Sequence, residues 1–327
     1  MKVLVTGATG FTGGHLARGL RTRGDEVSAM VRDPARAADL ARDGIRLVQG
    51  DLASPSSLAP ALTGGFDVVY NIAALYRQAG LAESVYDQVN AVAVGQLIDA
   101  AAAAGIRRVV HCSTVGVHGD VEHAPAGEDA PLRPGDVYQV SKVKGEQIAR
   151  EAEARTGVEV VIARPSGIYG PGDRRLLKLF RGVARRRFVV LGDGRIFYHL
   201  TYIDDLVDGF RLCGEVPRAA GRTYILAGAE APTLNELVAL IAAEAHVEPP
   251  KLHLPVWPVW FAGAACEALC APFGIEPPLY RRRVDFFTKS RAFDITRARE
   301  ELGYAPSVSL REGIHRTLEW YKQQRWI

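Results

Sequence analysis

The chain has 327 residues, of which 48% are hydrophobic and 24% are charged, and its formal net charge is +3. A chain of this length and composition can bury a large core, which excludes an intrinsically disordered protein. The small net charge argues against nucleic-acid binding, and the short basic runs at 185–188 and 280–284 are interpreted as solvated surface.

The apolar runs alternate with longer helical stretches through the first half of the chain. Strands are predicted at 2–6, 26–31, 45–48, 67–72, 108–113 and 158–163. Helices are predicted at 12–23, 85–104, 137–156, 174–186, 204–214, 233–246 and 310–323. Short, almost wholly apolar strands separated by helices are typical of a parallel sheet that is covered on both faces. The predicted fold class is therefore α/β, with the doubly wound parallel sheet of a Rossmann fold.

The alternation ends after residue 173, where Pro/Gly turns interrupt mixed segments. Residues 1–165, joined by 201–228, are predicted to form the dinucleotide-binding domain. Residues 166–200 and 229–327 are predicted to form a smaller C-terminal substrate-binding subdomain.

The segment 254–275 is the most apolar of the chain, but it contains three prolines and Glu267. We therefore predict no transmembrane segment. A lipophilic lid or interdomain helix is the favoured interpretation, and peripheral contact with a membrane stays open. Cys266 and Cys270 within it are interpreted as core packing.

The cysteines and the start of the sequence indicate the compartment. The four cysteines are Cys112, Cys213, Cys266 and Cys270. They form no Cys-x-x-Cys pair, so neither a metal site nor a disulfide scaffold is predicted. The first residues enter a strand with no apolar targeting region. A cytoplasmic protein is expected.

The stretch "VTGATGFTGGHL" (5–16) follows the first strand and opens a helix. It places Gly7, Gly10 and Gly13 three residues apart, with Phe11 and Thr12 between them. Glycines at this point let the turn close and let the backbone approach a pyrophosphate at the helix N-terminus. The sequence therefore predicts a site for NAD or NADP.

The end of the second predicted strand bears on the choice between these cofactors. NAD-binding proteins often place a carboxylate there, whereas this chain has Arg32, with Arg36 one helical turn later. Arginine can pair with a 2′-phosphate, which favours NADP. Two alternatives stay open, because Asp33 could turn inward and Arg32 could be merely solvated.

The next strand ends supply further candidates. Asp51 and Leu52 follow the third strand, and Ala73 and Ala74 follow the fourth. Since ligands bind outside the carboxyl ends of parallel strands, all four are predicted to face the cofactor.

The stretch "HCSTVGVHG" (111–119) brings Ser113 and Thr114 to the same edge, and "YQVSK" (138–142) puts Tyr138 and Lys142 on one helix face. A neighbouring ammonium would favour the phenolate of Tyr138. We expect Tyr138 to exchange a proton with a substrate hydroxyl while hydride moves to or from the nicotinamide. Thr114 would bind the same oxygen, and Lys142 would hold the ribose.

These motifs, with "RPSGIYGPGD" (164–173) and "YIDDLVDGF" (202–210), stand in an order that resembles the extended short-chain dehydrogenase/reductases of the NAD-dependent epimerase/dehydratase type. The resemblance runs through essentially the whole chain. It implies that Thr114, Tyr138 and Lys142 are catalytic. It also implies that Pro165, Ser166 and Ile168 lie near the nicotinamide. A homodimer built on helices 85–104 and 137–156 is implied as well.

The chain departs from relatives of this type that act on nucleotide sugars. His118 stands where they often have tyrosine, and Tyr198 stands near the place of an arginine that contacts the nucleotide diphosphate. Arg195 or the run Arg281, Arg282 and Arg283 could replace that arginine, and Arg174, Arg175 and Lys178 offer further cations. Meanwhile "AALYR" (73–77) and the apolar segment resemble hopanoid-associated sugar epimerases, hydroxysteroid dehydrogenases and dihydroflavonol reductases.

Three functions stay open. The first, which the overall pattern favours, is an epimerase or dehydratase of a nucleotide-linked sugar. The second is an NADP(H)-dependent reductase or dehydrogenase of a hydrophobic ketone or alcohol, favoured by Arg32, Tyr198 and the apolar segment. The third is a non-catalytic dinucleotide-sensing protein, which the intact Tyr138 and Lys142 argue against.

Overall fold

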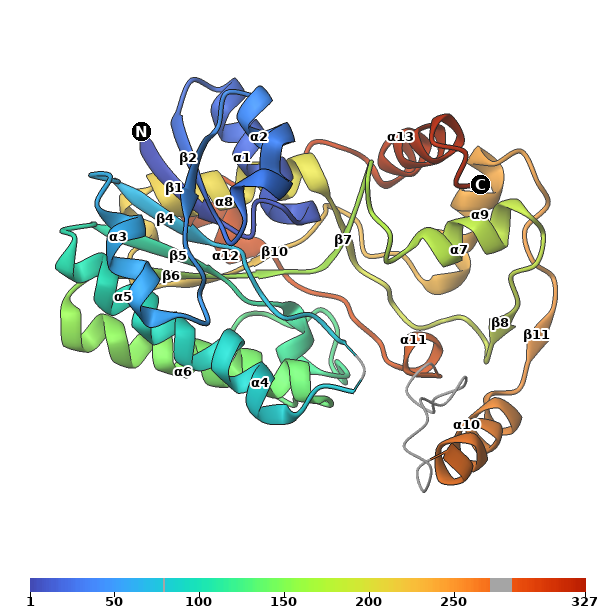
Figure 1. The fold of residues 1–327 in the computed structure, drawn as a ribbon. Helices are drawn as coiled ribbons and strands as arrows, with labels where there is room; N and C mark the ends of the chain where they lie inside the picture. Colours follow the sequence, from blue (N-terminus) through green and yellow to red (C-terminus); the bar gives the residue numbers. More distant parts are fainter. Residues whose placement is uncertain (79, 271–283) are drawn as a thin grey trace.

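The computed structural model describes residues 1–78, 80–270 and 284–327. Its main feature is a parallel sheet of seven strands in the order β10-β6-β5-β4-β1-β2-β3 (Figure 1). The strands are β1 (Lys2–Thr6), β2 (Glu26–Val31), β3 (Arg46–Gln49), β4 (Val68–Asn71), β5 (Arg108–Cys112), β6 (Glu159–Pro165) and β10 (Thr223–Leu226). The order reverses between β1 and β4, which confirms the predicted doubly wound sheet.

Helices cover both faces of this sheet. One face carries α3 (Leu58–Leu62), α5 (Ala93–Ala103) and α6 (Val137–Thr156), and the other carries α1 (Phe11–Thr22), α8 (Ile203–Glu215) and α12 (Thr296–Leu302). Alternate side chains of a strand point to opposite faces of the sheet. In β1, Leu4 packs in the core beneath α5 and α6, whereas Val3 and Val5 pack in the core beneath α1 and α8. The short α2 (Ala38–Arg42) lies beside β3.

The helix predicted at 85–104 is interrupted. It consists of α4 (Glu83–Asp87), a π-helical turn over Gln88–Val92, and α5. By contrast, the helix predicted at 137–156 is confirmed to the residue as α6. Asp136 caps its N-terminus by accepting from the Gln139 N–H, and Gly157 ends it in the left-handed conformation with φ 77°.

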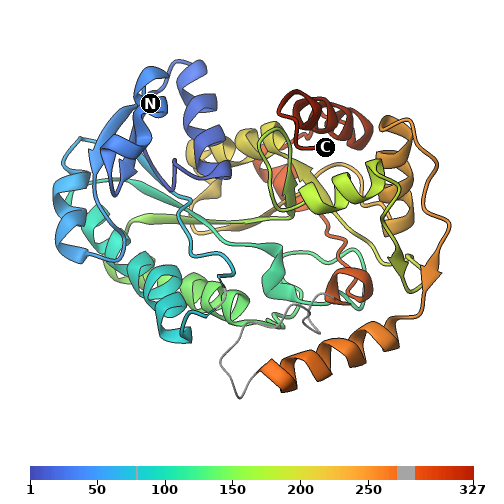
Figure 2. The ribbon, with the colours of Figure 1, turned by 45° about the vertical axis from the view of Figure 1, so that its right-hand side comes forward.

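A smaller group of elements lies beyond the carboxyl ends of the strands (Figure 2). It comprises the paired strands β7 (Gly167–Tyr169) and β9 (Leu200–Tyr202), the paired strands β8 (Val190–Leu191) and β11 (His253–Leu254), and the helices α7 (Leu177–Ala184), α9 (Leu234–Glu244), α10 (Val256–Cys270), α11 (Asp285–Thr288) and α13 (Leu310–Gln323). The division into two domains stays a prediction. Within the predicted subdomain range, α12 packs against β10 of the main sheet.

The helix α10 stands apart from the rest of the molecule in both views. Its side chains Trp257, Phe261 and Leu269 are 65%, 61% and 71% exposed. Cys266 and Cys270 are half-buried and belong to neither hydrophobic core, so the prediction that they pack in the core is wrong. None of the described helices combines the length and hydrophobicity that crossing a bilayer requires.

Candidate functional site

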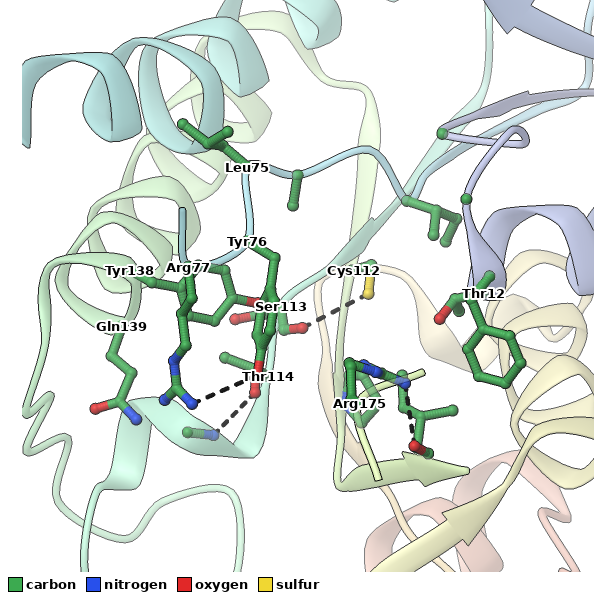
Figure 3. A pocket seen from close by; sticks show the side chains of 18 of the residues that line it. Thr12, Leu75, Tyr76, Arg77, Cys112, Ser113, Thr114, Tyr138, Gln139 and Arg175 are labelled. Atoms are coloured by element: carbon green, nitrogen blue, oxygen red, sulfur yellow. Dashed lines mark hydrogen bonds between the residues drawn. The ribbon is translucent and has the colours of Figure 1, made fainter. Parts of the chain in front are cut away.

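A cavity of about 1110 Å³ opens at the carboxyl ends of the sheet strands. Its floor comes from the loops after β1 to β6, and its far wall comes from β7, α7 and α11. Figure 3 shows the part of the cavity that is lined by Thr12, Tyr138 and Arg175. Most of the residues predicted to bind the cofactor line it. They are Gly7, Gly10, Phe11, Thr12, Gly13, Arg32, Asp51, Leu52, Ala73, Ala74, Ser113, Tyr138, Pro165, Ser166 and Ile168.

The glycine turn is closely fitted. Gly7 has a left-handed φ of 68°, and a Cβ on it would lie 2.7 Å from the Ala73 backbone nitrogen. A Cβ on Gly13 would lie 2.3 Å from the Gly7 carbonyl oxygen. Gly10 is the N-cap of α1 and, as a glycine, contributes no side-chain hydrogen bond to this end of the helix. These features fit the dinucleotide that the sequence predicts, because backbone N–H groups at a bare helix N-terminus bind phosphate.

The end of β2 places one of its two candidate arginines at the cleft. Arg32 is exposed and lines the cleft, whereas Arg36 lies in the 3-10 turn of Pro34–Ala37 and is absent from the described cleft lining. The Asp33 side chain accepts from the Ala35 N–H over 3.0 Å. Its carboxylate is therefore occupied in capping that turn.

The loop after β3 is held by local bonds. The Asp51 carboxylate accepts from the Ala53 N–H over 3.0 Å, and the Asp51 N–H donates to the Ser57 hydroxyl over 2.9 Å. Asp51 and the buried Leu52 are thereby fixed at the cleft edge beyond β3.

Tyr138 lies in the first turn of α6 and lines the cleft. Lys142, one turn later, is only 1% exposed, and its Nζ donates to the Cys112 carbonyl over 2.7 Å. Thr114 lines the cleft opposite, and its Oγ1 accepts from the Gly116 N–H. Among the described residues no hydrogen bond joins the Tyr138 hydroxyl to Lys142 or Thr114. The structure brings Tyr138 and Thr114 to the cleft, whereas the buried Lys142 is absent from the described lining.

Two arginines bear on the acidity of the Tyr138 phenol. Burial raises the pKa of Tyr138, and the cations that oppose this rise are Arg77 and Arg175. The Arg77 guanidinium carbon lies 5.9 Å from the Tyr138 ring centroid. Arg77 Nη2 donates a hydrogen bond to the Asp136 carboxylate over 2.8 Å. The ring of Tyr76 meets that of Tyr138 edge-on with centroids 5.0 Å apart. Figure 3 shows these side chains together.

The sequence reasoning missed the functional position of Arg77. Its backbone has a φ of 20°, which only a few non-glycine residues adopt. Such strain clusters at functional sites. The sequence stretch "AALYR" (73–77) resembles particular relatives and so draws attention to this loop. It does not indicate which residues Arg77 contacts.

Ser113 faces a second buried network. Its hydroxyl donates to Glu146, which forms a buried ion pair of 2.6 Å with Arg164. Arg164 also bonds the ring of His118 over 3.1 Å. His118 and His199 are both buried and hydrogen-bonded to the chain, His118 to the Pro131 carbonyl and His199 to the Gly228 carbonyl. Both histidines thus have structural contacts.

The far wall of the cleft is aromatic. Tyr198, the residue in the place of the expected arginine, packs on Phe286 with ring centroids 4.9 Å apart, and Phe286 packs on Phe287 at the same separation. Arg291 also lines this wall and pairs in register with Tyr198, a position that the sequence did not reveal. Of the predicted cations, Arg175 and Lys178 line the cleft.

Two other predicted cations lie outside the described lining of the cleft. Arg174 packs over the Trp326 ring, and Arg195 is exposed outside the described lining. Arg281, Arg282 and Arg283 lie outside the described residues. The described residues contain no cluster of His, Cys, Asp or Glu that could hold a metal ion.

A doubly wound sheet with this glycine turn and this Tyr-x-x-x-Lys helix defines a dinucleotide-dependent enzyme. The family model of the "NAD dependent epimerase/dehydratase family" matches residues 3–227. The chain therefore belongs to this family.

Curated relatives cover several reactions. The 2-alkyl-3-oxoalkanoate reductase of Stenotrophomonas maltophilia is 32% identical over 97% of this chain and 98% of its own. A 3beta-hydroxysteroid-dehydrogenase/decarboxylase isoform of Arabidopsis thaliana is 28% identical over 97% of this chain, which spans only 61% of that longer protein. The UDP-glucose 4-epimerase of Mycolicibacterium smegmatis is 28% identical over 99% of each chain.

A solved structure has the same fold throughout. MoeE5, in complex with UDP-glucuronic acid and NAD, superimposes with a TM-score of 0.76 and 27% identity, covering 99% of this chain and 100% of its own.

Proposed function

We propose that this protein is an NAD(P)-dependent oxidoreductase that interconverts a hydrophobic secondary alcohol and its ketone. The observation that carries the proposal is the aromatic wall of Tyr198, Phe286 and Phe287, which lines the same cleft as Tyr138. Aromatic side chains of this kind suit an apolar substrate. The names of the Stenotrophomonas and Arabidopsis relatives describe such substrates.

The fit of the glycine turn supports a bound dinucleotide. Gly7, Gly10 and Gly13 would hold the pyrophosphate, Asp51 and Leu52 the adenine end, and Pro165, Ser166 and Ile168 the nicotinamide end. When bound, the nicotinamide supplies the chemistry of hydride transfer. The exposed Arg32, with Asp33 occupied in its own turn, favours NADP over the NAD found in MoeE5.

The residues of the chain would handle the proton. In the oxidising direction the Tyr138 phenolate takes the hydroxyl proton of the alcohol while the carbon gives up hydride, and Thr114 holds the same oxygen. Arg77 and Arg175 would favour the phenolate, because their positive charges line the same cleft as Tyr138 and oppose the effect of burial on its pKa. In the reducing direction Tyr138 returns the proton to the ketone oxygen.

A nucleotide-sugar epimerase is the second candidate. Lys178 and Arg291 line the substrate half of the cleft and form no ion pair within the described residues, so they could bind a diphosphate. The Mycolicibacterium relative and MoeE5 support this candidate.

The predicted partners and compartment are part of the proposal. A homodimer through α4, α5 and α6 is supported by the exposed Val85 and Val92, which lie seven residues apart on that surface. The exposed apolar residues of α10 support peripheral membrane contact. A cytoplasmic location is proposed from the cysteine pattern alone.

The deciding experiment presents NADH or NADPH with a 3-oxoalkanoate, a ketosteroid or UDP-glucose and follows the nicotinamide absorbance. We expect cofactor oxidation with a hydrophobic ketone, and Tyr138→Phe should abolish it while keeping cofactor affinity. The outcome that overturns the proposal is no reaction with any ketone together with a rise in melting temperature caused by UDP. That result would favour the sugar epimerase.

A further inference from the structure

One arginine in the wall of the cleft has no counter-ion. Arg291 lines the substrate half of the cleft and is half-buried. Within the described residues its guanidinium forms neither an ion pair nor a side-chain hydrogen bond. Withdrawing a charge from water costs free energy unless a partner offsets that cost. An anionic group on a ligand would be such a partner for Arg291.

The acidic side chains that line this half of the cleft are paired with other cations. Asp136 pairs with Arg77 over 2.8 Å, and Asp285 pairs with Lys289 over 2.9 Å. Neither carboxylate forms an ion pair with Arg291. The described acidic residues of the cleft therefore leave the charge of Arg291 without a direct partner.

Two further cations line the cleft. Arg175 pairs with the buried Asp173 over 2.9 Å. Lys178 has no ion-pair partner among the described residues, but its side chain is exposed, and water screens an exposed charge. Arg291 combines partial burial with an unpaired charge, which makes it the cation of the cleft best suited to bind an anion.

Backbone hydrogen bonds fix the position of Arg291. Its N–H donates to the Phe197 carbonyl over 2.8 Å, and its carbonyl accepts from the His199 N–H over 2.9 Å. These two bonds flank Tyr198, which pairs in register with Arg291. A group that is already held in place binds a ligand with a smaller loss of entropy. Because the bonds involve only the backbone, substitutions of the Arg291 side chain should leave this pairing intact.

The surroundings of Arg291 are aromatic. Burial raises the pKa of Tyr198, and the charge of Arg291 opposes this rise. Tyr198 packs on Phe286, and Phe293 lines the cleft two residues after Arg291. A guanidinium binds a carboxylate through two parallel hydrogen bonds, and aromatic rings bind an apolar body. A single unpaired guanidinium among aromatic rings therefore fits a molecule that carries one carboxylate on an apolar body.

We propose that Arg291 determines specificity by pairing with a carboxylate of the substrate, which makes the ligand of the cleft an apolar molecule with one acidic group. That this acid is also the alcohol or ketone that reacts rests on the proposed function. Under that function its hydroxyl would meet Tyr138, its apolar body the aromatic wall, and its carboxylate Arg291. The binding of an apolar acid by Arg291 does not itself require hydride transfer.

Calorimetry with two nearly isosteric probes tests the proposal. Phenylbutanoate and phenylbutanamide share an apolar body and differ in charge. The protein is first saturated with NADP, or with NAD if that binds more tightly, so that the acid does not bind at the glycine turn. We expect the parent protein to bind the acid at least about tenfold more tightly than the amide. Arg291→Gln should lose this preference, and its unchanged affinity for the amide would show that the cleft is intact.

Arg195→Gln serves as the matched control, because it removes an exposed cation outside the described lining, and it should keep the preference for the acid. Equal affinities of the parent protein for acid and amide, or a preference that persists in Arg291→Gln, would overturn the proposal. Tighter binding of UDP than of the acid, lost in Arg291→Gln, would also overturn it and assign the position to a diphosphate. A preference for the acid that depends on Arg291, without reduction of any ketone, would refute only the proposed function.

Discussion

Acidification should weaken the fold through buried histidine. His111 is wholly buried and neutral, and burial lowers its pKa well below the ordinary value of 6.5. The unfolded chain binds a proton there while the folded chain does not, so the free energy of unfolding falls as the pH falls below about 6.5. Between pH 6.5 and 5.5 this single residue accounts for a loss of about 1 kcal/mol.

Urea unfolding at these two pH values measures the effect. His111→Phe cannot take up the proton, so it should lose about 1 kcal/mol less than the parent protein over the same interval. His123→Gln changes an exposed histidine and serves as the matched control. Its free energy of unfolding should fall by the same amount as that of the parent protein. Equal losses in the parent and His111→Phe would show that His111 is protonated in the folded state, and the reasoning would fail.

Three further substitutions test the site and its support. Gly13→Ala should abolish cofactor binding and destabilise by roughly 1–3 kcal/mol, because its Cβ would lie 2.3 Å from a carbonyl oxygen. Arg108→Met should cost more than about 3 kcal/mol in urea unfolding, because this buried guanidinium bonds four carbonyl oxygens at the end of α8. Arg77→Gln should shift the pH profile of alcohol oxidation upward, because the charge that opposes the raised pKa of Tyr138 is lost.

Each of these has a control in the chain. Gly127→Ala meets open space, Arg107→Met changes a half-exposed neighbour, and Arg174→Gln removes a cation packed on Trp326. Gly127→Ala should keep cofactor binding, Arg107→Met should keep most of the stability, and Arg174→Gln should leave the pH profile unchanged. If Gly13→Ala binds cofactor normally, if Arg108→Met matches Arg107→Met, or if the Arg77→Gln profile does not move, the respective argument is wrong.

The parts of the fold that short stretches of sequence determine were predictable. The α6 helix has its cap at Asp136 and its left-handed glycine at Gly157, so both ends are local. The glycine turn is also determined by a short stretch of sequence. Only the structure shows why Gly7 has no room for a side chain: a Cβ there would clash with the backbone of Ala73. The π-helical turn at Gln88–Val92 leaves the apolar pattern intact, so periodicity does not reveal it.

Contacts between distant segments were not predictable. Arg291 meets Tyr198 across nearly a hundred residues, and Arg77 meets Tyr138 only because the loop after β4 folds over α6. The expectation that Lys142 would be the cation acting on Tyr138 came from their spacing on one helix. Spacing fixes a face of the helix, whereas burial depends on the packing of every neighbouring element.

The cations near Tyr138 therefore lie in two different places. Arg77 and Arg175 line the cleft, and their charges oppose the rise that burial causes in the pKa of Tyr138. Lys142 lies behind the cleft wall, bonded to Cys112 and His111. A cation next to the substrate also attracts anionic groups, so Arg77 should influence both phenol acidity and substrate choice. Substitutions at Lys142 and Arg77 should then differ in kind: loss of Lys142 should affect every substrate alike, whereas loss of Arg77 should discriminate between anionic and neutral ones.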